Sequence, residues 1–367
     1  MFNGLGLGLR FLATVILAGA VAGSAWLPSS AAARIRKPQP ESIEYRRSWP
    51  LEAIGARSAY AAGYTGRGVR IAVVDCGVKR RSEFGRNLTR RDSVDLLPAR
   101  TVPLSDPHGA WVAEPLASAL DGVGTVGLAY NASLIEVRAD MDGGYQGECA
   151  FWSRDVARAM DYAVAARARI IVLPLQARRP LGPEFEAALA RAAASGAVIV
   201  AAAGNDTLND PAWPARYAAD PRFAASMVVA GATGPEGGMV DWSNRAGAAR
   251  ARYILAPGQW VLTDCRSKCQ FAHGTSFATP FVAGAIALVM EADPALSGAA
   301  AAERVLAAAA PVDAPGGPAA YGRGMLSVSR LFDPRAGGDA AAAPLVAPRP
   351  ERPPQPDASP LQPAQRR

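Results

Sequence analysis

The stretch Gly274-Thr275-Ser276-Phe277-Ala278-Thr279-Pro280 stands directly before a long apolar run, Phe281 to Met290. The apolar run predicts a buried helix, with Ser276 at its N-terminus. The first N–H groups of a helix lack partners within the helix, and the macrodipole adds partial positive charge there. An oxygen anion beside Ser276 would therefore be stabilised, which suits a nucleophile. A capped helix start without a function gives the same pattern, so the rest of the chain has to decide.

Three further motifs precede this stretch along the chain. Asp75 follows the apolar strand 69–74, at the edge where a parallel sheet places its ligand crevice. His108 and Gly109 open a second expected helix, and Asn205 closes the strand 198–203 after a glycine. Alone, each residue has an ordinary interpretation: a turn-capping Asp, a surface His, an Asn chosen for its turn geometry. Together they give the order Asp, His, Asn, Ser.

This order resembles that of the subtilisin-like serine proteases, the subtilase family, whose triad runs Asp, His, Ser. The resemblance covers roughly residues 43 to 333 and includes framing segments at 63–69, 256–258 and 321–324. It implies that Ser276 attacks a peptide carbonyl to form an acyl-enzyme, with His108 as general base and Asp75 orienting the imidazole. It also implies an oxyanion-hole donor, Asn205, and substrate-binding positions at Pro174, Leu175, Gln176, Ala202 and Gly204.

The chain has only two histidines, so the general base is either His108 or His273. His273 lies three residues before Ser276 in the same entering loop, where the backbone holds it. His108 comes from a separate helix and is able to approach the serine from across the sheet. We therefore assign the base to His108.

Strands alternate with helices along the chain, which predicts an α/β fold: a mostly parallel central sheet with helices on both faces, in three layers. Helices are expected at 53–62, 108–119, 152–166, 183–195, 281–290 and 299–310, and strands at 69–74, 133–137, 170–175, 198–203, 227–232 and 253–255.

The 367 residues, half of them apolar, suit one catalytic domain with extra ends. Residues 1–33 carry an apolar run followed by small residues and are expected to be an export signal or an N-terminal anchor. Residues 34–50 are expected to be a linker, 51–333 the peptidase domain, and 334–367 a disordered Pro/Ala-rich tail. The protein is therefore expected in the periplasm or outside the cell, and at a membrane only if the first segment stays uncleaved.

The formal net charge of +7 is spread over the chain, without a nucleic-acid motif. The expected partner is a polypeptide substrate and the expected state a monomer. The four cysteines, Cys76, Cys149, Cys265 and Cys269, allow three pairings, one of them with a small local ring between Cys265 and Cys269. No cofactor is expected. A structural calcium ion is left open, with Asp121 as a candidate ligand or an ordinary loop Asp.

Several positions depart from the family pattern. Pro115 stands inside the helix of His108 and is expected to bend or shorten it. Gln176 stands where the family has Gly and is expected to narrow the substrate groove. The segment Trp213-Pro214 resembles a family segment with a cis proline.

Two other classes of function agree less well with the sequence. A catalytically inactive, peptide-binding protein of the same fold would explain the departures and the lack of an evident propeptide. A lipase or esterase of the α/β-hydrolase type is excluded, because the serine lacks the G-x-S-x-G setting and the chain order differs. The sequence thus favours an exported serine endopeptidase.

Overall fold

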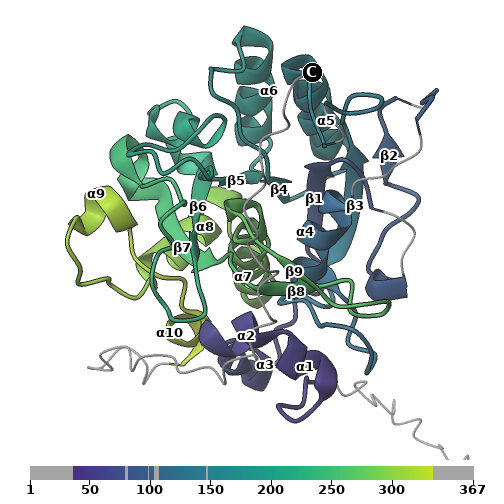
Figure 1. Ribbon diagram of the computed structural model, residues 1–367, viewed down its shortest axis with the longest axis vertical. Coiled ribbons are helices and arrows are strands. Elements are labelled where there is room, and N and C mark those ends of the chain that lie inside the picture. Colours follow the sequence, from purple (N-terminus) through teal and green to yellow (C-terminus); the bar gives the residue numbers. More distant parts are fainter. Residues whose placement is uncertain (1–35, 79–81, 98, 103–106, 146–147, 334–367) are drawn as a thin grey trace, which may run out of the picture. The chain divides into compact units, whose positions relative to one another are not determined.

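A computed structural model describes residues 36–78, 82–97, 99–102, 107–145 and 148–333 of the chain. The expected export segment 1–33 and the expected tail 334–367 lie outside the described residues. Within them, seven parallel strands form one sheet in the order β2-β3-β1-β4-β5-β6-β7, and helices lie on both of its faces (Figure 1). The predicted α/β fold class is confirmed.

The sheet strands are β1 (Arg70–Asp75), β2 (Val94–Asp95), β3 (Ser133–Arg138), β4 (Ile170–Leu173), β5 (Val198–Ala202), β6 (Met227–Thr233) and β7 (Tyr253–Pro257), and a separate antiparallel pair consists of β8 (Val261–Thr263) and β9 (Gln270–Ala272). The α-helices are α1 (Ile43–Arg47), α2 (Trp49–Ala53), α3 (Arg57–Ala62), α4 (His108–Ala117), α5 (Ser153–Ala165), α6 (Pro183–Ala194), α7 (Thr279–Ala292), α8 (Gly298–Ala307), α9 (Gly317–Tyr321) and α10 (Val328–Phe332).

The apolar sequence of β1 is explained by burial on both faces of the sheet. Ile71 and Val73 belong to the core shared with α4 and α7, whereas Ala72 and Val74 belong to the core shared with α5 and α6. Successive strand residues point to opposite faces, so a strand covered on both sides needs a continuous apolar run. The carboxyl end of β1 is then a fixed point, and Asp75 stands on it.

Helix α7 is the core helix that the opening stretch predicts. The segment Thr275–Ala292 is long and apolar enough to cross a membrane, but 83% of it is buried inside the domain. It packs against α4, α8 and the strands of the sheet. Burial in the core therefore accounts for its composition.

Two expectations about the chain need correction. Part of the stretch expected to be a linker, 34–50, is the helix α1, which Ser42 caps and which buries Glu44 and Tyr45. The helix was not predicted because the composition of this stretch is mostly polar. Helix α4 continues past Pro115 and ends at Ala117, two residues before the expected end at 119. The short strands β2, β8 and β9 were not predicted, since two or three residues show no periodicity.

Candidate active site

Asp75 is the last residue of β1, and its side chain is buried. The Cys76 N–H donates a hydrogen bond to Asp75 Oδ1 over 2.7 Å. On the neighbouring strand β3, Arg138 is the register partner of Asp75, and the Ala139 N–H donates to the Asp75 carbonyl. The turn after β1 therefore holds the carboxylate in one place.

His108 is the first residue of α4, and its Nδ1 lies 3.0 and 2.9 Å from the two carboxylate oxygens of Asp75. This close approach needs Gly109, since a Cβ there would lie 2.6 Å from the Gly77 carbonyl oxygen and 3.1 Å from Asp75 Cβ. An acceptor at Nδ1 selects the neutral tautomer that carries its proton on Nδ1. The acceptor lone pair of that tautomer is then on Nε2.

Ser276 lies in the 3₁₀ segment Thr275–Phe277 that leads into α7, and its hydroxyl donates a 2.8 Å hydrogen bond to the Pro174 carbonyl. Ser276 and His108 both line a cleft of about 840 Å³. The cleft is also lined by the expected substrate positions Pro174, Leu175 and Gln176. Side chains from three distant parts of the chain thus meet at one concave surface.

Asn205 is fixed by its side-chain oxygen. Its Oδ1 accepts hydrogen bonds from the Thr275 N–H and hydroxyl, both over 2.9 Å. A Cβ added at Gly274, where φ is +144°, would lie 3.6 Å from Asn205 Nδ2 and 3.7 Å from the Ser276 nitrogen. The amide of Asn205 and the backbone of Ser276 therefore border the same small space, which glycine leaves open.

Gln176 lines the cleft and also contacts the loop of Asn205. Its Oε1 accepts a 2.8 Å hydrogen bond from the Asn205 N–H, and its Nε2 donates to Asp206 Oδ2 over 3.3 Å. The two other expected substrate positions lie deeper. Ala202 is buried in β5, and the Gly204 N–H donates to Thr275 Oγ1, so neither lines the cleft.

The second histidine lies apart from this cleft. His273 Nδ1 accepts a 3.3 Å hydrogen bond from the Trp260 N–H, and the two rings pack edge to face at 4.5 Å. Burial lowers the pKa of His273. His273 is thus held against Trp260, and it is not among the residues that line the cleft.

Three residues of the site were missed from the sequence. Thr275 holds both Asn205 and Gly204, and Cys149 and Phe151 line the cleft from the loop between β3 and α5. Thr275 stood inside the opening motif, but nothing in the spacing of the loop points to the cleft. Two of the four cysteines, Cys76 and Cys149, form one disulfide, and Cys265–Cys269, the local pairing that the sequence left open, is the other.

The described residues contain one close group of possible metal-ligand atoms, at Asp75, Cys76 and Cys149, and both of its sulfurs are in the disulfide. The candidate calcium ligand Asp121 forms an ion pair with Arg266, which also contacts Glu83 Oε2 over 2.6 Å.

The Trp213-Pro214 peptide bond is cis, as the resemblance to the family implied.

Comparisons with known proteins show which family and which fold this chain resembles. The model of the subtilase family matches residues 66–325. Subtilisin E of Bacillus subtilis is 28% identical over 298 residues, which cover 78% of this chain and 71% of the relative. Subtilisin BL of Lederbergia lenta is 30% identical over 251 residues, covering 68% and 86%.

Two solved structures share the fold. A mutant of the protease domain of PatA superposes with a TM-score of 0.63 at 26% identity, covering 76% of this chain and 98% of that one. The prenylagaramide maturation protease PagA gives the same TM-score at 23% identity, covering 76% and 97%.

Proposed function

This chain belongs to the subtilase family, and the subtilisins among its relatives are serine proteases. From that premise, we propose that the chain is an exported serine endopeptidase. One observation carries the proposal: His108 Nδ1 is bonded to both oxygens of Asp75, and the same imidazole shares a cleft with Ser276. Serine, histidine and aspartate in these relations form the hydrolytic triad.

In the proposed reaction, the Ser276 hydroxyl turns from the Pro174 carbonyl and gives its proton to His108 Nε2 while its oxygen attacks the peptide carbonyl. His108 then passes this proton to the leaving amine, and an acyl-enzyme remains. Water repeats the sequence and frees the second product. Asp75 keeps the imidazole in its tautomer and stabilises the imidazolium that forms at each step.

The oxyanion of the tetrahedral intermediate would lie in the space over Gly274. Asn205 Nδ2 and the Ser276 N–H are its proposed donors, and Thr275 holds the amide of Asn205 in the orientation that this role needs. Fixed donors stabilise charge without reorganising at the moment of reaction. The triad and these donors need no cofactor.

The substrate is proposed to be a polypeptide in extended form, bound as an added strand along residues 174–176 by main-chain hydrogen bonds. The Pro174 carbonyl becomes an acceptor for the substrate backbone once Ser276 turns away from it. The protein is proposed to act as a monomer after export to the periplasm or the medium.

The test is Ser276→Ala, compared with Ser153→Ala, a serine that lines the same cleft. We expect Ser276→Ala to abolish hydrolysis of casein and labelling by a fluorophosphonate probe, and Ser153→Ala to retain both. Labelling of the Ser276→Ala protein at the wild-type level would remove Ser276 from the mechanism.

The alternative, a peptide-binding protein without turnover, is favoured by one observation: the side chain of Gln176 spans from the substrate strand to Asn205 and Asp206. A folded wild-type protein that retains peptides but neither cleaves them nor takes the probe would support this alternative.

A further inference from the structure

The disulfide Cys76–Cys149 joins the turn after β1 to the wall of the cleft. Its Cα atoms lie 5.9 Å apart, although the cysteines are 73 positions apart in sequence. We propose that this disulfide positions the active site: it holds the Asp75 turn and the cleft wall together, and opening it lowers turnover in a protein that stays folded. The proposal rests on the proposed function for its activity readout.

One end of the disulfide acts on Asp75. Cys76 is fully buried, and its N–H donates to Asp75 Oδ1, the same oxygen that lies 3.0 Å from His108 Nδ1. A backbone donor stabilises the carboxylate charge and fixes the direction of its oxygens. A shift of Cys76 therefore moves one of the groups that orient the carboxylate toward the imidazole.

The other end acts on the substrate side of the cleft. Cys149 lines the cleft together with Ala150 and Phe151, in the loop that connects β3 to α5. Within this loop, the Met141 N–H donates to the Ala150 carbonyl over 2.8 Å. The disulfide adds a covalent tie from this wall to Cys76, which directly follows Asp75 at the end of β1.

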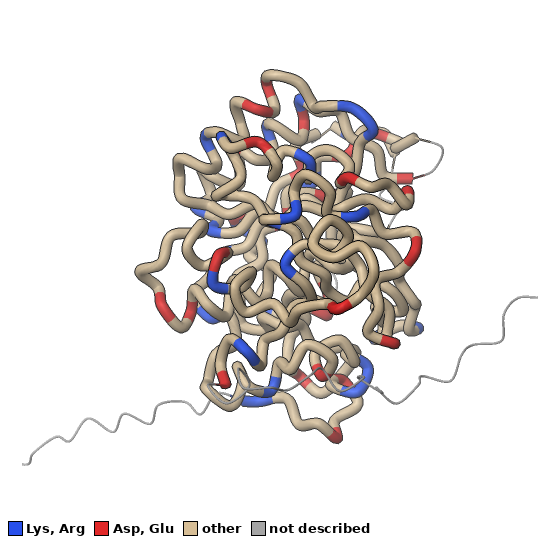
Figure 2. The backbone as a smooth tube through the Cα atoms, turned by 90° about the vertical axis from the view of Figure 1, so that its left-hand side faces the viewer, with Lys and Arg blue, Asp and Glu red and all other residues tan. Residues whose placement is uncertain are grey.

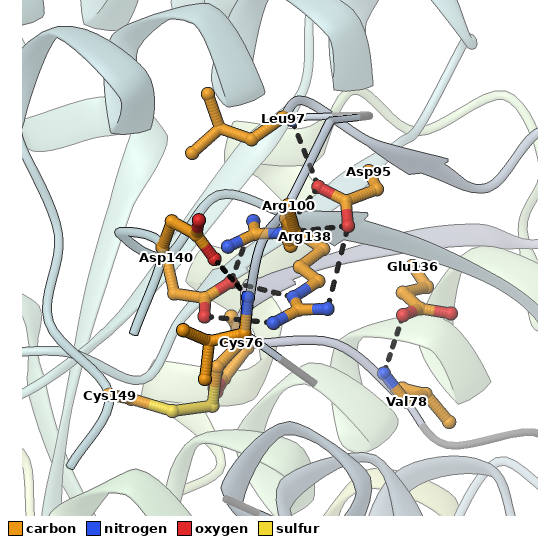
Figure 3. A network of polar contacts seen from close by, with 12 residues as sticks. Cys76, Val78, Asp95, Leu97, Arg100, Glu136, Arg138, Asp140 and Cys149 are labelled. Atoms are coloured by element: carbon orange, nitrogen blue, oxygen red, sulfur yellow. Dashed lines mark hydrogen bonds and ion pairs between the residues drawn. A yellow bond between two sulfur atoms is a disulfide. The ribbon is translucent and has the colours of Figure 1, made fainter. Parts of the chain in front are cut away.

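Non-covalent contacts around the disulfide explain why its loss should stay local (Figure 3). The Val78 N–H donates to Glu136 Oε1 over 2.5 Å, which holds the far side of the Asp75 turn. Asp140, at the start of the loop, pairs with Arg138 over 2.8 Å and with Arg100 over 2.9 Å. These contacts survive reduction, while the link between the turn and the cleft wall does not.

The second disulfide, Cys265–Cys269, is a matched control. It closes a ring within one loop between β8 and β9, and neither of its residues lines the cleft. A reductant such as tris(2-carboxyethyl)phosphine opens a disulfide to two thiols by supplying two electrons, with two protons from water, and becomes the phosphine oxide. The phosphine does not distinguish between the two disulfides, so paired variants are needed to separate their effects.

The first experiment measures kcat/KM on a fluorogenic peptide for the full chain with and without the phosphine. We expect reduction to lower kcat/KM of the wild type by about 10-fold or more, mainly through kcat, and reoxidation to restore it. The Cys76→Ala/Cys149→Ala double variant should be equally slow and insensitive to reductant. The Cys265→Ala/Cys269→Ala double variant should behave like the wild type.

A second readout, histidine NMR of the wild-type protein, depends neither on the folding of the variants nor on activity. The chain has only two histidines, so ¹⁵N-histidine labelling gives separate imidazole NMR signals for His108 and His273. In the intact wild type, reduction should move the His108 signals and leave those of His273, which lies outside the cleft, in place. Mass spectrometry of alkylated thiols confirms which disulfide has opened.

The outcomes separate the two proposals. If the oxidised wild type neither cleaves peptides nor takes a serine probe, the proposed protease function fails, and the NMR readout still decides the role of the disulfide. If Cys76 and Cys149 are opened in a folded protein while kcat/KM and the His108 signals stay unchanged, the disulfide is only a stabilising link, and the inference is wrong.

Discussion

The two sides of the cleft are built differently. The Asp75 side comprises residues 75–78, His108, Glu136 and Cys149, and the Asn205 side comprises residues 174–176, 204–206 and Thr275. On the first, Asp75 is only 2% exposed, the disulfide begins at the next residue, and the half-buried Glu136 and the Arg138–Asp140 ion pair belong to or follow the neighbouring strand β3. On the second, Asn205 is exposed and its partners are uncharged groups. In the view of Figure 2, positively and negatively charged residues are scattered along the backbone among uncharged ones.

The difference follows from what each side does in the proposed reaction. A carboxylate that orients an imidazole acts best where water cannot compete for it, and burial then requires donors and counter-charges nearby. The Asn205 side has to admit a polypeptide, so its groups stay near solvent and are held by hydrogen bonds alone. Removing parts of the two sides should therefore have effects of very different size.

The largest effect is expected for Asp75→Asn. The amide has the same shape but no charge, and it favours the wrong tautomer of His108, so kcat should fall by about 10⁴-fold. Steady-state kinetics on a fluorogenic peptide would measure this. The control is Asp161→Asn, an exposed carboxyl on α5 paired with Arg191. A loss below about 10-fold at Asp75 would remove the orienting role.

The next effect is expected for Asn205→Ala. Loss of one oxyanion donor costs about 10²–10³ in kcat, with little change in KM, because the donor acts mainly on the transition state. The control is Asn209→Ala, an exposed Asn in the same loop. Equal changes in KM for both variants, with kcat intact, would show that Asn205 only shapes the loop.

How far the sequence predicted these two sides also differs. The positions of Asp75 and His108 follow from a buried strand and a helix start, because strand ends and helix starts fix the direction of the first side chain beyond them. The fold class followed from the alternation of strands and helices. The positions of these two residues and the fold class depend on short local patterns, which can be read from a single sequence.

The Asn205 side and the disulfide depend on contacts between segments far apart in the chain. Nothing local in Gln176 shows that its Oε1 accepts from the Asn205 N–H, and four cysteines alone leave three pairings open. The helix α1 was missed because only two of its five residues are buried, and one of these, Glu44, is charged. Such features require the coordinates.

A smaller effect is expected for Gln176→Ala. The bond from the Asn205 N–H to Gln176 Oε1 is exposed, and a net hydrogen bond of about 1 kcal/mol corresponds to a change of about 5-fold in kcat/KM. The variant also removes side-chain volume from the groove, so kcat/KM for bulky peptides should rise relative to kcat/KM for small ones. A peptide series measures both, with Gln39→Ala as the distant control. An unchanged ranking of peptides would show that Gln176 does not limit access.

The smallest effect is expected for Glu136→Gln, and it tests the Asp75 side through stability. Burial raises the pKa of Glu136 from 4.5 to about 7, with Asp95 and Asp75 adding to the shift and the Val78 N–H and Arg138 opposing it. Between about pH 4.5 and 7 the folded chain keeps a proton that the unfolded chain has released. Stability therefore falls as pH rises through this window, and the loss is complete above it.

Glutamine carries no charge at any pH and can still accept from the Val78 N–H. The difference in melting temperature, variant minus parent, should therefore be about 2–4 °C larger at pH 8 than at pH 5. Circular dichroism measures it, with both proteins carrying Ser276→Ala to prevent self-digestion. Glu184→Gln, an exposed change on α6, should show no such trend. A difference that stays constant with pH would mean that Glu136 is charged throughout, with its charge balanced by Arg138 and the Val78 N–H.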